Sequence, residues 1–579
     1  MSQQHTKYGT SSLKNDDEFR FATTDCCRRR VVKWAAAAVA VSVGGALIAV
    51  STSGLSSPGG ATSPAAEKHG AVNCWQSSYI GGEKKMMEPI TSGLEWKKKT
   101  DGAKATSFIA VDVSKKFQEI LGFGGAFTEA SGVQFSKLPP AKQEEMLKLY
   151  FDKEKGSGYE FGRVPMGSSD FSLGSYSFDD VPNDMSLSHF DTNVTRDTQY
   201  IIPFIQRALE KNPQLKIMLA PWSPPGWMKR ASETYIPSIM GTAKPIGLKD
   251  EAQPAWALYF SKFISAYKSH GINFWGLSPQ NEPESAVPWE SCEYTAPFEA
   301  EFIANHLGPV IKRDHPDVKI MVFDQNRDSL LHWTETILSH PGASKYVDGV
   351  SFHWYGALQH LDGVEFYDRL NDTHYMVGNR FLLAAESCNC PGNGSAAVAH
   401  GDEAWVRGQR YGRDILMDIN NWAVGWVDWN LILDHTGGPN HMQNLCDAPI
   451  VVDETEKDYF IQPMYYFIQH FSKFVQSGSR RIHTDVSATF KKAGDAQLFV
   501  RYPAALHSCD SSARQAIHVT EDSKLQVTGT PFCLILVNDA GRAKWVGPQI
   551  ELVECQYTTQ TWTFKDGQIR LKDQCLALK

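Results

Sequence analysis

From about residue 118 onward, the chain alternates between short apolar runs and longer amphipathic segments. Apolar runs closed by turn-forming residues are typical of buried parallel strands, and the segments between them have the apolar spacing of helices. Eight such runs occupy residues 120–127, 161–167, 215–221, 272–279, 318–324, 350–355, 381–386 and 422–430. Eight βα units predict an α/β fold, a (β/α)8 TIM barrel over residues 118–460, with a doubly wound open sheet as the alternative.

Polar residues follow the predicted strands at their carboxyl ends, which face the ligand site in this class of fold. Asn281 and Glu282 follow the fourth run, and Glu386 follows the seventh. In a closed barrel these strands lie across the mouth from each other, and glycoside hydrolysis needs two carboxyl groups flanking the bond. Arg163, at the exit of the second run, is placed to form a salt bridge with Glu386 and keep that carboxylate ionised.

Two further motifs at these exits admit a metal interpretation. His353 has no second histidine at ligand spacing, so we expect an orienting hydrogen bond or plain packing rather than metal binding. Cys388 and Cys390 form one isolated pair, for which we expect disulfides rather than a redox or zinc centre. The sequence therefore predicts neither a metal nor a cofactor.

An apolar run of 20 residues occupies positions 31–50, follows three arginines and is interrupted only by Lys33 and Ser42. A run of this length can span a bilayer, and basic residues on its N-terminal side keep that side cytoplasmic. We therefore expect a cytoplasmic tail over residues 1–30, a type II signal anchor over 31–50 and a stalk over 51–70, with the catalytic part in the lumen or outside the cell. Cleavage of the run, which gives a secreted or lysosomal protein, is the alternative.

Composition and charge narrow the class of protein further. The formal net charge is −8 and there is no long basic block, so we expect no nucleic-acid partner. The 16 Trp and 20 Tyr residues suit a carbohydrate site, because their ring faces stack on sugars. Asn193, Asn371 and Asn393 begin glycosylation sequons. Two of the 11 cysteines precede the stalk, and the remaining odd number leaves at least one thiol unpaired.

Six motifs occur in order along the predicted barrel. They are RVPMGSSDFS at 163–172, PWSPPGWMK at 221–229, QNEP at 280–283, HWY at 353–355, AESC at 385–388 and GWVDWN at 425–430. This ordered set resembles glycoside hydrolase family 30, above all its glucosylceramidases of the lysosomal acid β-glucosidase type, and the similarity extends from about residue 74 to about residue 480.

The resemblance implies a retaining β-glucosidase that hydrolyses glucosylceramide or a related β-glucoside by double displacement. Glu282 matches the general acid/base, Glu386 the nucleophile, and Asn281 a residue that holds the sugar 2-hydroxyl or the nucleophile. Asp170, Trp222 and Trp429 match residues that bind glucose, Tyr355 a tyrosine near the nucleophile, and Asn444 a substrate-pocket asparagine. The implied partners are a glycolipid or β-glucan substrate and an activator protein. An endo-β-1,6-glucanase of the same family and a carbohydrate-binding protein without catalysis are the alternatives.

Both chain ends predict accessory β structure. Residues 71–117 contain strand-like pieces without following helices, and the resemblance places them with residues 461–505 in an antiparallel β-sandwich. Residues 506–579 contain an internal repeat with an offset of about 45 residues, whose Cys-Leu and Gln-X-Trp signatures resemble ricin-type lectin repeats. This implies a partial β-trefoil in which Cys533 and Cys555 close one loop, with a structural extension of the sandwich as the alternative.

Overall fold

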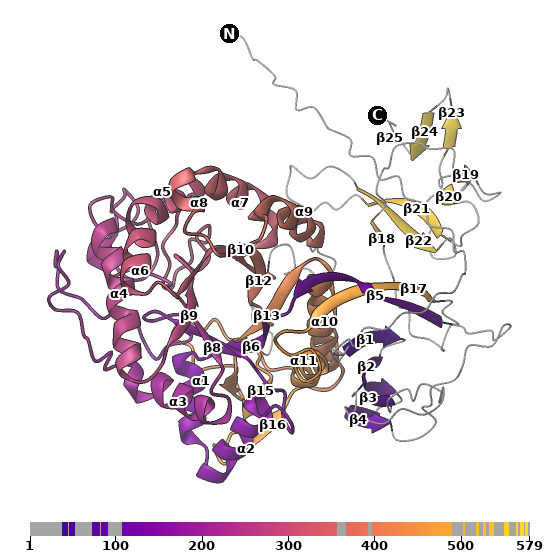
Figure 1. Cartoon of the computed structure of the whole chain (residues 1–579), viewed down its shortest axis with the longest axis horizontal. Coiled ribbons are helices and arrows are strands. Elements are labelled where there is room, and N and C mark those ends of the chain that lie inside the picture. Colours follow the sequence, from indigo (N-terminus) through magenta and orange to yellow (C-terminus); the bar gives the residue numbers. More distant parts are fainter. Residues whose placement is uncertain are drawn as a thin grey trace, which may run out of the picture.

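The computed structural model describes residues 107–355, 366–391 and 397–488 without interruption, and outside them only short strands (Figure 1). The N-terminal ones are β1 (Ala38–Val43), β2 (Ala46–Thr52), β3 (Val72–Ile80) and β4 (Glu83–Ile90). The C-terminal ones are β18 (Tyr502–Pro503), β19 (Ile517–Val519), β20 (Leu525–Val527), β21 (Phe532–Val537), β22 (Gln549–Glu554), β23 (Thr563–Lys565), β24 (Gln568–Leu571) and β25 (Gln574–Leu576).

Eight parallel strands close into a barrel, which confirms the (β/α)8 prediction and excludes the open sheet. They are β6 (Gly122–Ala126), β7 (Phe161–Pro165), β8 (Lys216–Ala220), β9 (Phe274–Leu277), β10 (Lys319–Asn326), β11 (Gly349–His353), β12 (Phe381–Glu386) and β13 (Ala423–Asn430). Their near-continuous apolar runs arise because strands of a parallel sheet are buried on both faces. Phe161, Met218, Met321 and Leu383, from four of these strands, form one buried cluster.

Helices surround the barrel, as Figure 1 shows. They are α1 (Glu129–Lys137), α2 (Pro140–Phe151), α3 (Ile201–Lys211), α4 (Gln253–Ser269), α5 (Ala296–Phe302), α6 (Gly308–Asp314), α7 (Leu330–Ser339), α8 (Pro341–Ser344), α9 (Tyr367–Val377), α10 (Gly401–Asn420) and α11 (Pro463–Ser472). Short turns are η1 (Asp197–Gln199), η2 (Gly226–Met228), η3 (Ile303–Leu307) and η4 (Arg327–Ser329). In α3, Ile201, Phe204, Ile205 and Ala208 share the buried face, which is the i, i+3, i+4 pattern that the sequence predicted.

The described part of the apolar run at 31–50 forms strands and not the expected anchor helix. Ala38–Val43 and Ala46–Thr52 form β1 and β2 of a four-stranded antiparallel sheet with β3 and β4. Among the described residues, no helix combines the length and apolarity needed to cross a bilayer. The type II prediction is therefore wrong. Apolar length alone cannot distinguish a spanning helix from paired strands, and the β-branched valines of this run favour strands.

The segments on either side of the barrel meet outside it. β5 (Ser107–Glu119) pairs antiparallel with β17 (Arg480–Ala488), and the β1–β4 sheet lies against α11, where the rings of Trp75 and Phe474 are 4.6 Å apart between centroids. β18–β22 form a five-stranded sheet and β23–β25 a three-stranded one. The complete sandwich and the trefoil remain predictions. Cys555 lies outside the described residues, so the predicted Cys533–Cys555 disulfide does too.

Closure of the barrel between its first and last strands requires glycine at a close approach, and this generates a prediction. Gly425 of β13 is the register partner of Gly122 of β6, and a Cβ on Gly425 would collide with the Gly122 carbonyl oxygen. We expect Gly425→Ala to lower the free energy of unfolding by roughly 1–3 kcal/mol through overpacking. Thermal unfolding measures this as a lower midpoint. Gly174→Ala is the matched control, because its Cβ would meet no atom within 4 Å; equal midpoints for the two variants would contradict the argument.

Candidate active site

The peptide segment after β9 carries Asn281 and Glu282 at the mouth of the barrel. The Asn281 backbone N–H donates to the Pro221 carbonyl at 2.8 Å, and the Glu282 N–H donates to the Asp324 carbonyl at 3.0 Å. Glu282 has a φ of 44°, a left-handed conformation that is uncommon outside glycine. The exits of the neighbouring strands β8 and β10 thus hold this strained residue in place.

Glu386 ends β12 and is buried. Its Oε2 accepts a charged hydrogen bond from the Arg163 guanidinium, which is the salt bridge predicted from the sequence. Its Oε1 accepts from the Tyr355 hydroxyl at 2.9 Å. Burial raises the pKa of the Glu386 carboxyl, and the charges of Arg163 and His353 act against this rise.

Asp324 connects the two sides of the mouth, and sequence reasoning did not select it. Its Oδ2 accepts from Arg163 at 2.9 Å, and its Oδ1 lies 3.1 Å from His353 Nε2. Arg163 also donates to Asn281 Oδ1 at 2.8 Å. Burial alone would raise the pKa of Asp324, but the charges of Arg163 and His353 outweigh it and lower the pKa well below its usual range.

The ring of His353 lies between two carboxyl groups. Its Nδ1 lies 3.2 Å from Glu282 Oε1 and its Nε2 faces Asp324. Burial would lower its pKa, but the negative charges of Glu386 and Asp324 and its two hydrogen bonds raise it to about 9. Both ring nitrogens therefore face carboxyl oxygens. The orienting hydrogen bond expected from the sequence is the observed arrangement.

Ligand atoms of Glu282, His353 and Glu386 lie within 4.8 Å of one another. The two carboxyl groups expected from strands four and seven are therefore neighbours in space.

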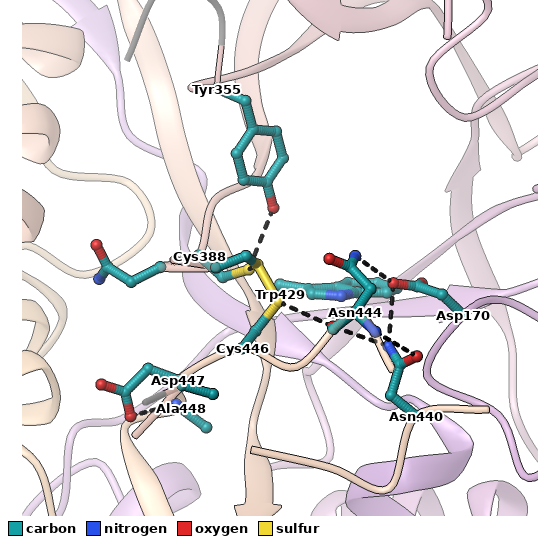
Figure 2. The surroundings of a disulfide bond; sticks show 12 residues. Asp170, Tyr355, Cys388, Trp429, Asn440, Asn444, Cys446, Asp447 and Ala448 are labelled. Atoms are coloured by element: carbon teal, nitrogen blue, oxygen red, sulfur yellow. Dashed lines mark hydrogen bonds between the residues drawn. A yellow bond between two sulfur atoms is a disulfide. The ribbon is translucent and has the colours of Figure 1, made fainter. Parts of the chain in front are cut away.

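A second part of the site consists of aromatic rings and amides. Trp222 and Trp429 are stacked, with ring centroids 4.9 Å apart, and the Arg163 guanidinium lies 4.9 Å from the Trp222 ring. Asp170 Oδ2 accepts from Asn444 Nδ2 at 2.9 Å and from Asn440 Nδ2 at 3.2 Å (Figure 2). Burial raises the pKa of Asp170 to about 7. Asn440, which no sequence motif marked, completes this cradle.

A bulge in β10 is a further feature that the sequence gave no signal for. Phe323 and Asp324 have φ values of 81° and 52°, and the pairing with β11 shifts between Phe323 and Gln325. The buried Glu299 carboxyl accepts from the Phe323 N–H at 3.1 Å. Burial raises the pKa of Glu299 to about 8. The bulge turns Asp324 toward Arg163 and His353.

The predicted modification sites have different surroundings. Asn193 is exposed, whereas Asn371 is half-buried and accepts from Trp422 Nε1 at 3.2 Å. Asn393 lies outside the described residues.

Cys390 forms a disulfide with Cys446, as expected for one member of the Cys388 and Cys390 pair.

Comparison with known proteins identifies the family. A model of the glycosyl hydrolase family 30 TIM-barrel domain matches residues 120–475. The chain belongs to glycosyl hydrolase family 30. This family 30 glycoside hydrolase is similar to the lysosomal acid glucosylceramidase of Mus musculus, at 36% identity over 380 residues, which is 65% of this chain and 71% of the relative. It is more distantly similar to the endo-1,6-beta-D-glucanase of Neurospora crassa, at 28% identity over 391 residues, which is 66% of this chain and 75% of the relative. The solved structure of SrfJ from Salmonella typhimurium superposes with a TM-score of 0.62 at 27% identity and covers 81% of this chain and 94% of that chain.

The charge of His353 links the stability of this family 30 enzyme to pH. An unfolded histidine has a pKa of about 6.5, so the raised folded value of about 9 contributes stability that is complete below pH ~6.5 and is lost as pH rises toward 9. The contribution has an upper size of about 3 kcal/mol. We expect the stability difference between the wild type and His353→Gln to shrink over this range. Urea unfolding at a series of pH values measures it, and a difference independent of pH would contradict the raised pKa.

Proposed function

We propose that this chain is a retaining β-glucosidase in which Glu386 is the nucleophile and Glu282 the general acid and base. The observation that carries the proposal is the short separation of the two carboxyl groups, within 4.8 Å. Retaining glycosidases hold this pair about 5 Å apart, whereas inverting ones leave about 6.5–9.5 Å for a water molecule.

The surroundings of the two glutamates differ as the two roles require. Arg163 and Tyr355 both donate to Glu386, and such donors favour the ionised form that attacks carbon. The Glu282 side chain is 19% exposed and lies toward the mouth, where a leaving group departs. His353, held by Asp324, orients Glu282 through its Nδ1.

In the first step, Glu386 forms a bond to the anomeric carbon while the bond to the leaving oxygen breaks and that oxygen takes the Glu282 proton. A water molecule then gives its proton to Glu282 and attacks the same carbon, which releases Glu386. Two inversions at one centre retain the β configuration. Asn281, fixed by Arg163, lies where it can hold the sugar 2-hydroxyl.

The cradle around Asp170 supports a terminal glucose as the sugar in this pocket. The Asp170 carboxyl can accept hydrogen bonds from sugar hydroxyls, and the stacked rings of Trp222 and Trp429 belong to the same apolar cluster as Phe171, the residue after Asp170. The named mammalian relative is a glucosylceramidase, so we propose glucosylceramide or a related β-glucoside as the substrate. An endo-β-1,6-glucanase activity, named for the fungal relative, is the second candidate. A carbohydrate-binding protein without catalysis is disfavoured because both carboxylates are present.

The accessory parts follow from the same proposal. We propose that β5, β17 and the strands at both chain ends form the side β-sandwich, and that residues 506–579 carry lectin-like repeats. An activator protein that presents the glycolipid is proposed on the same resemblance.

The roles of the two glutamates are tested by amide substitution. We expect Glu386→Gln to abolish hydrolysis, and Glu282→Gln to lower turnover by roughly 10²–10⁴-fold on substrates with a poor leaving group. With a good leaving group, azide rescues only Glu282→Gln and yields the β-glucosyl azide, because it attacks the ester on Glu386 in place of water. Steady-state kinetics and proton NMR of the azide product measure both outcomes.

Glu284→Gln is the matched control, since among the described residues the exposed Glu284 carboxyl accepts only from the Trp333 Nε1 at 2.7 Å, and an amide can also accept. Normal hydrolysis by either Glu282→Gln or Glu386→Gln would refute the assignment.

The substrate is tested by a side-by-side assay of the full chain on glucosylceramide in detergent micelles and on a β-1,6-glucan. We expect glucose release from glucosylceramide and little from the polymer, because in this proposal Asp170 and its asparagines hold one terminal glucose unit. Release of oligosaccharides from the glucan with no cleavage of the lipid would instead select the endo-glucanase.

A further inference from the structure

Three cysteine sulfurs lie together just beyond Glu386. Cys390 is disulfide-bonded to Cys446, and Cys388 carries a free thiol whose Sγ is 2.8 Å from Cys390 Sγ. All three sulfurs lie within 4.8 Å of one another. Cys388 and Cys446 are buried, and Cys390 is partly exposed. A thiol sulfur that lies closer to a disulfide sulfur than van der Waals contact has the arrangement from which thiol–disulfide exchange starts.

The three cysteines contact both the part of the site around Glu386 and the loop that holds Asp170. The Tyr355 hydroxyl donates to Glu386 Oε1 at 2.9 Å and lies 3.4 Å from Cys388 Sγ, so a single hydroxyl touches the glutamate and the thiol. Cys446 belongs to the loop between β14 (Ile432–Asp434) and β15 (Ile450–Val452), which also supplies the asparagines of the Asp170 cradle. Figure 2 shows the disulfide between Tyr355 on one side and Asp170 with its asparagines on the other.

We propose that Cys388, Cys390 and Cys446 form a thiol–disulfide exchange site that switches the sugar-binding loop between a tied and an untied state. The Cys388 thiol loses its proton to solvent, and its sulfur forms a bond to Cys390 Sγ. The Cys390–Cys446 bond breaks, and its electron pair leaves on Cys446 Sγ, which takes up a proton. One disulfide and one thiol are present before and after, so no external oxidant or reductant is needed.

The exchange alters the site in a defined way. In the tied state the disulfide joins the Asn440 and Asn444 loop to the segment after β12. In the untied state the loop keeps only its other contacts there, such as the Asp447 N–H to the Asn389 carbonyl at 2.8 Å and the Ala399 N–H to Asp447 Oδ2 at 3.0 Å. The cradle of Asp170 then loosens without unfolding. We expect KM for a β-glucoside to rise about tenfold, the loss that follows from weakening one hydrogen bond to a charged group.

The groups around Cys388 set the pH at which exchange occurs. Burial raises the pKa of its thiol well above the usual range, and the carboxyl groups of Glu386, Asp428 and Asp170 add to this, while the Tyr355 hydroxyl acts against it. Since the thiolate is the attacking form, the tied state persists in acid and exchange accelerates as the solution becomes alkaline. Acidic conditions thus keep the loop in its sugar-binding arrangement.

The test maps the free thiol of the purified, active full chain without reductant. Samples held in mildly acidic and in mildly alkaline buffer are quenched with acid, unfolded and alkylated with one isotopic label. They are then reduced and alkylated with a second label, digested, and read by mass spectrometry. We expect the first label on Cys388 after acid, and a growing share on Cys446 after alkaline incubation. A first label confined to Cys388 in both samples would overturn the proposal, and this readout does not depend on glycosidase activity.

Two variants separate the switch from a loss of stability. Cys446→Ser leaves only the untied pairing, and we expect it to contain a Cys388–Cys390 disulfide and to show the tenfold rise in KM. Partial misfolding would instead reduce the amount of active enzyme, and so the apparent kcat, at unchanged KM. Cys388→Ser keeps the tied disulfide and a hydroxyl beside Tyr355, and its KM should not change on alkaline incubation. Free Cys388 and Cys390 thiols in folded, air-oxidised Cys446→Ser would also refute the exchange.

Discussion

The buried guanidinium of Arg163 is the group on which the arrangement of the site depends. A charge removed from water is costly unless it is paired and hydrogen-bonded, and Arg163 meets this requirement with Glu386, Asn281 and Asp324. These partners come from the exits of β12, β9 and β10, while Arg163 itself lies on β7. Satisfying one cation therefore fixes four strand ends relative to one another at the mouth of the barrel.

The bulge in β10 is the second constraint, because it allows one residue to serve two neighbours. With Phe323 and Asp324 both at positive φ, the Asp324 side chain reaches Arg163 and His353 while its carbonyl accepts from the Glu282 N–H. The backbone strain at Phe323 and Asp324 is offset by the Glu299 carboxyl, which accepts a hydrogen bond from the Phe323 N–H. A regular strand would turn the side chain at 324 to one face only, so the local irregularity is part of the site.

The sequence was sufficient for features set by local pattern and insufficient for those set by tertiary contact. Eight apolar runs predicted the barrel, and their exits supplied Arg163, Glu282 and Glu386, because strand ends of a barrel must converge. Asp324 stood at an exit too, but only the bulge shows its direction, and Asn440 reaches Asp170 from a loop with no periodic signal. The prediction of an anchor at 31–50 was wrong because hydropathy does not show which strands will pair with each other. Here β1 pairs with β2, and β2 pairs with β3.

The charges of the site explain why one imidazolium suits both steps of the proposed reaction. In the proposed reaction Glu386 attacks as a carboxylate and Glu282 donates a proton, while Arg163 and His353 lie opposite Asp324 and Glu386. After attack, Glu386 is an uncharged ester and the negative charge has moved to Glu282. His353 has its Nδ1 at 3.2 Å from Glu282, and it lies within 4.8 Å of Glu386. It therefore faces the negative charge in both states. The net charge of the site stays constant through the proposed step, which avoids the reorganisation that an unbalanced charge would require.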